Sequence, residues 1–219
     1  MSTAADETHR VPRLDFELTS ACDHGCGHCY NVWGAEGDEP QSGYPRGQLS
    51  APAYVALMEK AVTQSGADHI TITGGEPLLH KGALAIIDRA CALVSSVHVI
   101  TNGSHVTPAV AERFAEAGVR CVQLTLLSAD RALHDRLKGS VCFDDTVRAA
   151  VELLAHRVPV AVCFVAMAEN ADEIEGVMEL CFALGVRALT YNRMAPAGGG
   201  VRVIEALLPD AEQVERHLG

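Results

Sequence analysis

The chain has 219 residues, of which 48% are hydrophobic and only 5% aromatic, and its formal net charge is −11. This length predicts a single domain with a sizeable aliphatic core, and the acidic balance argues against a nucleic-acid partner, which needs clustered lysine and arginine. The polar N-terminus has no apolar stretch typical of a signal peptide, and no apolar run is long enough to cross a bilayer. We therefore expect a cytoplasmic protein whose eight cysteines are ligands or core residues rather than disulfides.

Short apolar segments that alternate with helical patterns predict six strands. In chain order they cover residues 13–19, 69–73, 97–101, 119–127, 158–166 and 186–192. Alternation of this kind predicts βαβ units and a parallel sheet, so the fold class is α/β. Six such units fit either a partial barrel or a doubly wound sheet, and periodicity alone does not choose between them.

The segments between these strands carry the start and stop signals of helices. Ser50 can cap the first helix, and Thr107 followed by Pro108 is an N-cap with a first-turn proline. Gly118 ends the helix that Thr107 begins, and Gly185 ends a later one. Apolar residues recur at helical spacing on four helices: Val55, Met58 and Val62; Leu84, Ile87, Cys91 and Val94; Val147, Ala150, Val151 and Leu154; and Ile174, Val177, Met178 and Cys181.

A glycine-rich loop at 197–200 follows the last predicted strand, and Asp210 with Gln213 predicts the cap of one more helix. We divide the sequence into a polar N-terminal tail (1–12), a core domain (13–205) and an incomplete C-terminal helix (206–219). A helix that ends so early is typical of a naturally minimal protein or of a fragment of a longer one.

The decisive segment is ACDHGCGHCY at residues 21–30, which contains Cys22, Cys26 and Cys29. This spacing lets three thiolates meet on one small cluster, and Gly25 and Gly27 are expected to supply left-handed turns. A 4Fe–4S cube takes four cysteine ligands, and this loop has three. One iron would therefore keep an open position, as catalytic metal sites generally do.

A zinc site is the alternative for this loop, because the three cysteines with His24 or His28 would make a Cys3His set. The cysteines outside the loop are interpreted differently, because free cysteine is commonly buried. Those predicted to pack in the core are Cys91, Cys121, Cys163 and Cys181.

A second motif, TITGGEP at residues 71–77, places a glycine pair and an acid at the end of the second predicted strand. Ligands of parallel α/β proteins bind beyond the carboxyl ends of the strands. Gly74 and Gly75 permit close backbone approach there, and Glu76 could receive an ammonium group of a ligand. Because the cysteine loop also follows a strand, both motifs are expected at the same rim.

Together, the CxxxCxxC loop after the first strand and GGEP after the second resemble the radical S-adenosylmethionine (SAM) superfamily, from residue 14 to about residue 200. The resemblance implies a partial (β/α)6 barrel with parallel strands and a 4Fe–4S cluster on Cys22, Cys26 and Cys29. SAM would occupy the open iron through its amino and carboxylate groups. The reduced cluster would cleave SAM to methionine and a 5′-deoxyadenosyl radical that abstracts hydrogen from a substrate. An electron donor such as flavodoxin or ferredoxin is also implied.

The same resemblance implies a set of SAM-binding residues. The GGEP segment resembles the part that binds the amino group, and one of two hydroxyls resembles the group that meets the ribose or carboxylate. One residue departs from the family pattern, because His28 stands where an aromatic residue is usual; it could still stack near the adenine. The full set is His28, Gly74, Gly75, Glu76, Pro77, Asn102, Thr125 or Ser128, Asn192 and Arg193. For Asn102, a tight Asn-Gly turn is an equal alternative.

The segments 122–140 and 193–198, with Asn170, most resemble maturases of ribosomally made peptides, including an HDxxxG stretch that starts at His134. The alternative for that stretch is a solvated helix start. Such maturases often carry a SPASM or twitch region with auxiliary clusters, whereas no cysteine follows Cys181 here. Either a separate recognition protein or a missing C-terminal part would then present the precursor peptide. Three other hypotheses stay open: a radical SAM enzyme for a sugar, nucleoside or tetrapyrrole, a zinc or ferredoxin-like binding protein, and an inactive truncated relic.

Overall fold

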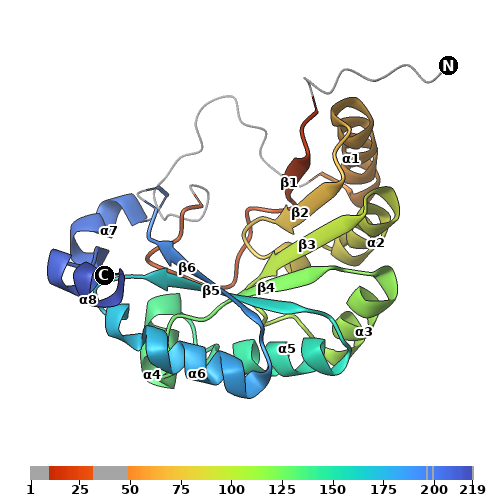
Figure 1. Ribbon diagram of the computed structural model, residues 1–219. Coiled ribbons are helices and arrows are strands. Elements are labelled where there is room, and N and C mark those ends of the chain that lie inside the picture. Colours follow the sequence, from red (N-terminus) through yellow and green to blue (C-terminus); the bar gives the residue numbers. More distant parts are fainter. Residues whose placement is uncertain (1–9, 32–48, 196, 199, 219) are drawn as a thin grey trace.

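A six-stranded, all-parallel sheet forms the centre of the computed structural model, which describes residues 10–31, 49–195, 197, 198 and 200–218 (Figure 1). The strands follow one another across the sheet in chain order, β1 to β6. Their bounds are β1 Arg13–Glu17, β2 His69–Thr73, β3 Ser96–Thr101, β4 Cys121–Thr125, β5 Val160–Ala166 and β6 Ala188–Arg193.

Helices connect consecutive strands, and two more follow β6. They are α1 Ala51–Ser65, α2 Ala83–Leu93, α3 Pro108–Ala117, α4 Arg131–Lys138, α5 Phe143–Ala155, α6 Ile174–Leu184, α7 Gly200–Leu207 and α8 Ala211–Leu218, with short 3-10 turns at Pro77–Leu79 and Ala171–Glu173. Figure 1 shows α1, α2, α3, α5 and α6 on the convex side, while the described chain places no helix on the concave side. A doubly wound sheet would reverse its strand order and carry helices on both faces. The sequential order confirms the α/β prediction and selects the unclosed partial barrel.

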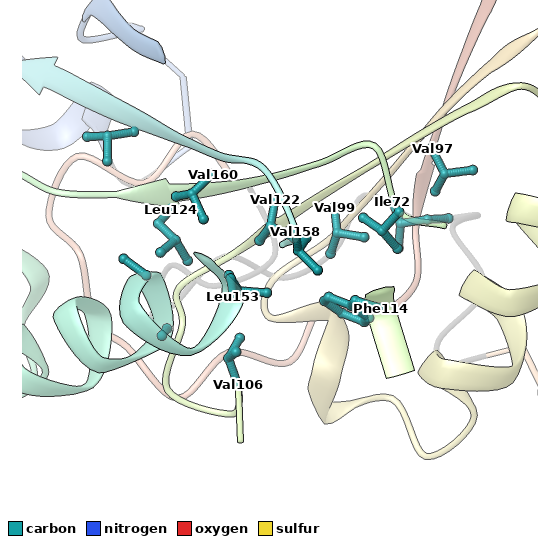
Figure 2. Close-up of a cluster of buried hydrophobic side chains, with 14 of the residues drawn as sticks. Ile72, Val97, Val99, Val106, Phe114, Val122, Leu124, Leu153, Val158 and Val160 are labelled. Atoms are coloured by element: carbon teal, nitrogen blue, oxygen red, sulfur yellow. The ribbon is translucent and has the colours of Figure 1, made fainter. Parts of the chain in front are cut away.

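The core lies between the strands and the convex-side helices. Alternate strand residues point toward the helices, as the pleat requires, and Figure 2 shows Ile72, Val99 and Leu124 in this layer with Phe114 and Leu153 from α3 and α5. Phe114 and Leu153 are completely buried. The other residues of each strand point to the concave side, so the sheet that builds the core also builds an open surface.

Three strands begin two residues later than the sequence predicts, and one local cause explains all three. Val119, Val158 and Val186 each donate the main-chain N–H to a carbonyl of the helix before them, on Phe114, Leu153 and Cys181 respectively. These valines are at most 9% exposed. Each valine therefore caps the preceding helix with its N–H and packs its side chain against the core, and the strand starts after it.

Some predicted helix faces are also wrong at their edges. Leu84, Val151 and Met178 are 36%, 49% and 56% exposed. Small residues such as Ala149 are buried in their place, because helices that pack closely on a sheet favour short side chains at the contact. The domain boundary predicted at residue 205 falls inside α7. Within the described residues, no helix is long and apolar enough to cross a membrane.

Candidate functional site

The cysteine loop leaves the carboxyl end of β1 and folds over the rim of the barrel. Cys22 is exposed, Cys26 and Cys29 are half-buried, and the Cys29 N–H donates to the carbonyl of Cys26 at 3.1 Å. Sulfur ligands of a tetrahedral zinc at 2.3 Å would lie about 3.8 Å apart. In the part of the chain that the structure describes, these thiols do not form a group within 4.8 Å. In this conformation the three thiols are therefore farther apart than the sulfur ligands of one bound zinc ion.

Glycines from other segments, rather than those inside the cysteine loop, allow the close packing of its main chain. Gly25 and Gly27 do not have positive φ angles, so the prediction that they supply left-handed turns is wrong. Instead Gly74, Gly139 and Gly198 have φ angles of 146°, 60° and 58°. A Cβ on Gly139 would lie 2.5 Å from the Gly25 oxygen, and one on Gly198 would lie 2.5 Å from the main chain of Tyr30.

The GGEP segment is joined to the cysteine loop by main-chain hydrogen bonds. Gly75 N–H donates to the Thr19 carbonyl at 2.7 Å, and Glu76 N–H donates to the Ala21 carbonyl at 2.8 Å. A Cβ on Gly75 would lie 2.2 Å from the Ala21 oxygen. The two motifs that the sequence predicts at one rim are thus in direct contact.

Glu76 is fully buried, and both of its carboxylate oxygens accept hydrogen bonds. Oε1 accepts from Leu78 N at 3.0 Å and Thr101 Oγ1 at 2.8 Å, and Oε2 accepts from Asn102 N at 2.7 Å. Burial raises the pKa of this carboxyl group, against the effect of these donors. Glu76 therefore braces the ends of β2 and β3, a role that the sequence did not suggest. Its predicted contact with an ammonium group stays a prediction.

A polar network ties the cysteine loop to the β3–α3 turn. Asn102 Nδ2 donates to Asp23 Oδ1 at 2.7 Å, while Asp23 Oδ2 lies 2.8 Å from His105 Nε2. His24 Nε2 lies 3.0 Å from Ser104 Oγ. Asn102 Oδ1 also accepts from Ser104 N–H, so the tight-turn interpretation of Asn102 is correct, while its contact with SAM stays a prediction. The Asn102 side chain points to the loop that holds the cysteines.

We expect Asp23→Ala to weaken the loop's hold on a bound cluster. Burial opposes ionisation of Asp23, yet hydrogen bonds from Asn102 and His105 lower its pKa, so its charge is anchored at neutral pH. Loss of such an outer-shell partner typically costs about tenfold or more in metal affinity. Cluster loss to a chelator, followed by visible absorbance, should be about tenfold faster. The control is Asp144→Ala on the outer face of α5, which should not change the rate.

Buried imidazole nitrogens without partners gather beside the cysteine loop. His24 Nδ1, His28 Nδ1 and His134 Nε2 are three of four such side-chain atoms within the described residues. Burial, with the nearby charge of Lys138, lowers the pKa of both His28 and His134 to about 4, so both imidazoles are neutral. Buried polar atoms normally have partners. These nitrogens mark a place where a bound group would supply the missing hydrogen-bond partners.

The HDxxxG stretch lies in α4, directly beneath the loop. His134 is completely buried and its Nδ1 accepts from Leu127 N–H at 3.2 Å, so the solvated alternative is wrong for this residue. Asp135 Oδ1 accepts from the N–H groups of Cys142 and Phe143, which fixes the start of α5. Donor atoms of His134, Asp135 and Cys142 lie within 4.8 Å of one another, while His134 Nδ1 and Asp135 Oδ1 already accept main-chain hydrogen bonds.

Sequence reasoning missed Lys138 as a site residue. It ends α4 and is only 3% exposed, and no carboxylate in the described chain pairs with it. Its charge lowers the pKa of Cys26, although burial has the larger, opposite effect. A buried lysine is rare unless it is paired. The burial of Lys138 becomes visible only in the fold, so no pattern in the sequence marks it.

The remaining predicted residues differ in whether their side chains already make hydrogen bonds within the described chain. Ser128 is fully buried, and its hydroxyl donates to Glu173 Oε2 at 2.5 Å and accepts from Asp130 N–H. Thr125 is half-buried at the carboxyl end of β4, with no hydrogen bond of its side chain among the described residues. Asn192 and Arg193 are exposed at the end of β6, where Asn192 Nδ2 donates to Cys163 Sγ at 3.2 Å.

Comparisons with known proteins agree with this geometry. The sporulation killing factor maturation protein SkfB of Bacillus subtilis (strain 168) is 30% identical over 199 residues, which are 90% of this chain and 46% of SkfB. The mycofactocin maturase MftC of Mycolicibacterium smegmatis is 30% identical over 201 residues, 91% of this chain and 49% of MftC. The chain thus spans about half the length of these relatives.

A structural match covers the same part of the fold. The crystal structure of Streptococcus suis SuiB bound to the precursor peptide SuiA has a TM-score of 0.72 at 16% identity, covering 86% of this chain and 40% of that one. The sequence model described as the Radical SAM superfamily matches residues 16–181. Because that match includes both the cysteine loop and the GGEP rim, the chain belongs to the radical SAM superfamily.

Proposed function

We propose that this chain binds a 4Fe–4S cluster through Cys22, Cys26 and Cys29 and cleaves SAM reductively to modify a ribosomally made peptide. One observation carries the proposal: the cysteine loop and the GGEP rim are joined by the Gly75 and Glu76 hydrogen bonds at the open end of a partial barrel. The chain's residues fit the cluster, since three thiols share one loop and buried imidazole nitrogens beside them lack partners.

A cluster held by Cys22, Cys26 and Cys29 would supply the electron for reductive cleavage of SAM to methionine and a hydrogen-abstracting radical. The chain's part is to bind, orient and exclude water. We assign the main chain of Gly74 to Pro77 to the amino group of SAM, and Thr125 rather than Ser128 to its ribose or carboxylate. His28, Asn192 and Arg193 are assigned to the adenine side, where neutral His28 has an apolar face for stacking.

Lys138 is proposed to hold the carboxylate of SAM. Its ammonium group is buried beside the cysteines and no described carboxylate balances its charge, so a bound anion would. We expect Lys138→Met to keep the iron content and to weaken SAM binding at least about tenfold, because a hydrogen bond to a charged group contributes about 1.5–3 kcal/mol. Equilibrium dialysis with SAM measures this change. Lys138→Arg should restore most of the affinity, and unchanged binding by the Met variant would show that the lysine has a different role.

The peptide substrate is supported by the relatives rather than by this chain alone. SkfB and MftC are named as maturation proteins, and the SuiB structure contains a precursor peptide. Each relative is about twice as long as the matched part, so substrate, partners and complete activity are proposals for this chain. We propose flavodoxin or ferredoxin as the electron donor and a separate protein for peptide recognition.

The test is anaerobic reconstitution followed by SAM and a strong reductant, with 5′-deoxyadenosine as the product measured. Formation of 5′-deoxyadenosine by the wild type supports SAM cleavage. Bound zinc, or a cluster that forms without any cleavage, would contradict the proposal for this chain.

A further inference from the structure

The concave face of the sheet carries a polar surface that the SAM site does not use. Strand register places Asp15, Thr71, His98 and Cys121 in one row across β1 to β4, and Arg13, His69 and Ser96 in the next row toward the strand N-termini. All are on the face opposite the core, because their neighbours along each strand pack against the helices. No described helix covers this face (Figure 1).

Two histidines form the centre of this surface. The rings of His69 and His98 meet edge to face, with centroids 4.4 Å apart and an interplanar angle of 77°. Both residues are half-buried and remain accessible from the barrel interior. His69 Nε2 makes only a long 3.4 Å contact with Thr71 Oγ1, and His98 has no hydrogen-bond partner among the described residues. Their ring nitrogens are available to a ligand.

The charges around the pair favour an anion. Arg13 Nε donates to Asp15 Oδ1 at 2.9 Å, so the one acid here is already paired. Burial, and then the positive charges of His69, Arg13 and Arg120, lower the pKa of His98. The permanent charges near the pair are thus two arginines, Arg13 and Arg120, against one acid, Asp15, in a chain that has 28 acidic and only 17 basic residues. Local excess of one sign against the overall balance indicates a binding surface for the opposite sign.

We propose that His69 and His98, with Arg13 beside them, form a subsite for a carboxylate of the substrate peptide; this rests on the proposed function. The pair donates imidazole N–H groups to the carboxylate, and Arg13 adds charge at the entrance. His69 lies four residues before Thr73 at the end of β2, which is about 13 Å at 3.3 Å per residue. An extended peptide covers that distance with about four residues. The carboxylate therefore belongs about four positions from the residue that reacts at the rim.

A pH dependence follows from the groups that face His98: Arg13 and Asp15 on β1, His69 on β2, and Arg120 and Cys121 at the start of β4. In the free protein, burial and the charges of His69, Arg13 and Arg120 hold the pKa of His98 low. A bound carboxylate raises it, so the complex takes up protons. Binding should be tightest in mild acid and should weaken as pH rises through the pKa of the complex.

The experiment uses the reconstituted protein with 15N-labelled histidine and three pentapeptides. Two have blocked ends, with glutamate at the centre of one and glutamine at the centre of the other. The third is all alanine with a free C-terminal carboxylate. We expect a carboxylate peptide, but not the glutamine peptide, to shift the ring signals of His69 and His98. The control is the ring signal of His156, which lies at the end of α5 with its Nδ1 against the Glu152 carbonyl oxygen. This signal should not move.

Two variants sharpen the test. His98→Asn should weaken binding of the effective peptide about tenfold, and Arg13→Gln should weaken it less, because Arg13 is more exposed. A response to glutamate identifies a side-chain carboxylate, and a response to the free terminus alone identifies the peptide end. Equal shifts with glutamine, no shift with any peptide, or unchanged binding by His98→Asn would overturn the subsite.

The result is separable from the proposed function. SAM cleavage is measured on the wild type without peptide, whereas the ring signals report peptide binding without reductant. Peptide binding without cleavage would contradict the radical function and leave the carboxylate subsite standing. Cleavage without carboxylate-dependent shifts would contradict the subsite and leave the radical function standing.

Discussion

Cys26→Ala should lose both the iron–sulfur cluster and the formation of 5′-deoxyadenosine. Burial raises the pKa of the Cys26 thiol, and nearby Cys29 and Cys22 add to this, while Lys138 opposes it. A metal ligand must be deprotonated, so in the protein without metal burial and the neighbouring cysteines act against the thiolate that binding requires. With one ligand removed, only two thiols remain to hold the cluster.

The expected size of the effect is large. Loss of an outer-shell partner already costs about 10–100-fold at metal sites, so loss of a ligand should lower product formation to less than about one-hundredth. Iron and sulfide content, visible absorbance and 5′-deoxyadenosine are measured on the same preparation. Cys91→Ala on α2 is the matched control, since that half-buried thiol, its pKa raised to about 11 by burial, lies away from the loop. If Cys26→Ala kept its iron and its activity, the assignment of the three ligands would be wrong.

The sequence predicts most of the fold because most strands and helices have local signals. The strand 69–73 has the predicted bounds, and Thr107 caps α3 by accepting from Val110 N–H, as its position before Pro108 indicates. Choosing the barrel over the doubly wound sheet needed the resemblance to a family. The reason is physical: the side on which a helix crosses the sheet is decided by packing between distant segments, and no single βα unit records it.

The site was only partly predictable for the same reason. Cys22, Cys26 and Cys29 are close in sequence, so their spacing alone indicates a shared ligand. Lys138 gives no such signal, because only the fold of α4 against the loop buries it. The choice between Thr125 and Ser128 likewise depended on Glu173, which is 45 residues from Ser128 and occupies its hydroxyl.

The glycines show how a correct motif can carry a wrong local explanation. Gly25 and Gly27 lie between the cysteines, and their position suggests that they shape the loop. The structure gives that role to glycines from other segments, whose missing side chains make room for the loop's main chain. Close approach between two segments is a property of the pair, so one segment's sequence cannot report it.

Gly75→Ala is therefore expected to disrupt the site more than any change within the loop that leaves the cysteines intact. The new Cβ would lie 2.2 Å from the Ala21 oxygen, 2.7 Å from the Ala21 carbonyl carbon and 2.8 Å from the Ser20 oxygen. All three are main-chain atoms, so no side-chain rotation relieves the clash. The loop or the rim must move, and the hydrogen bond from Gly75 N–H to Thr19 would be strained with it.

Gly27→Ala provides the matched control, because a Cβ at that position meets nothing within 4 Å and the φ angle is not positive. Overpacking of this kind typically costs about 2 kcal/mol, which for a chain of this length lowers Tm by about 4–8 °C. Thermal unfolding and iron content are measured for both variants after the same reconstitution. We expect Gly75→Ala to show the lower Tm and to lose most of its iron, with Gly27→Ala close to the wild type on both. Equal Tm and iron content of the two variants would mean that contact between the GGEP rim and the cysteine loop does not hold the cluster. The proposed function would then lose its main geometric support.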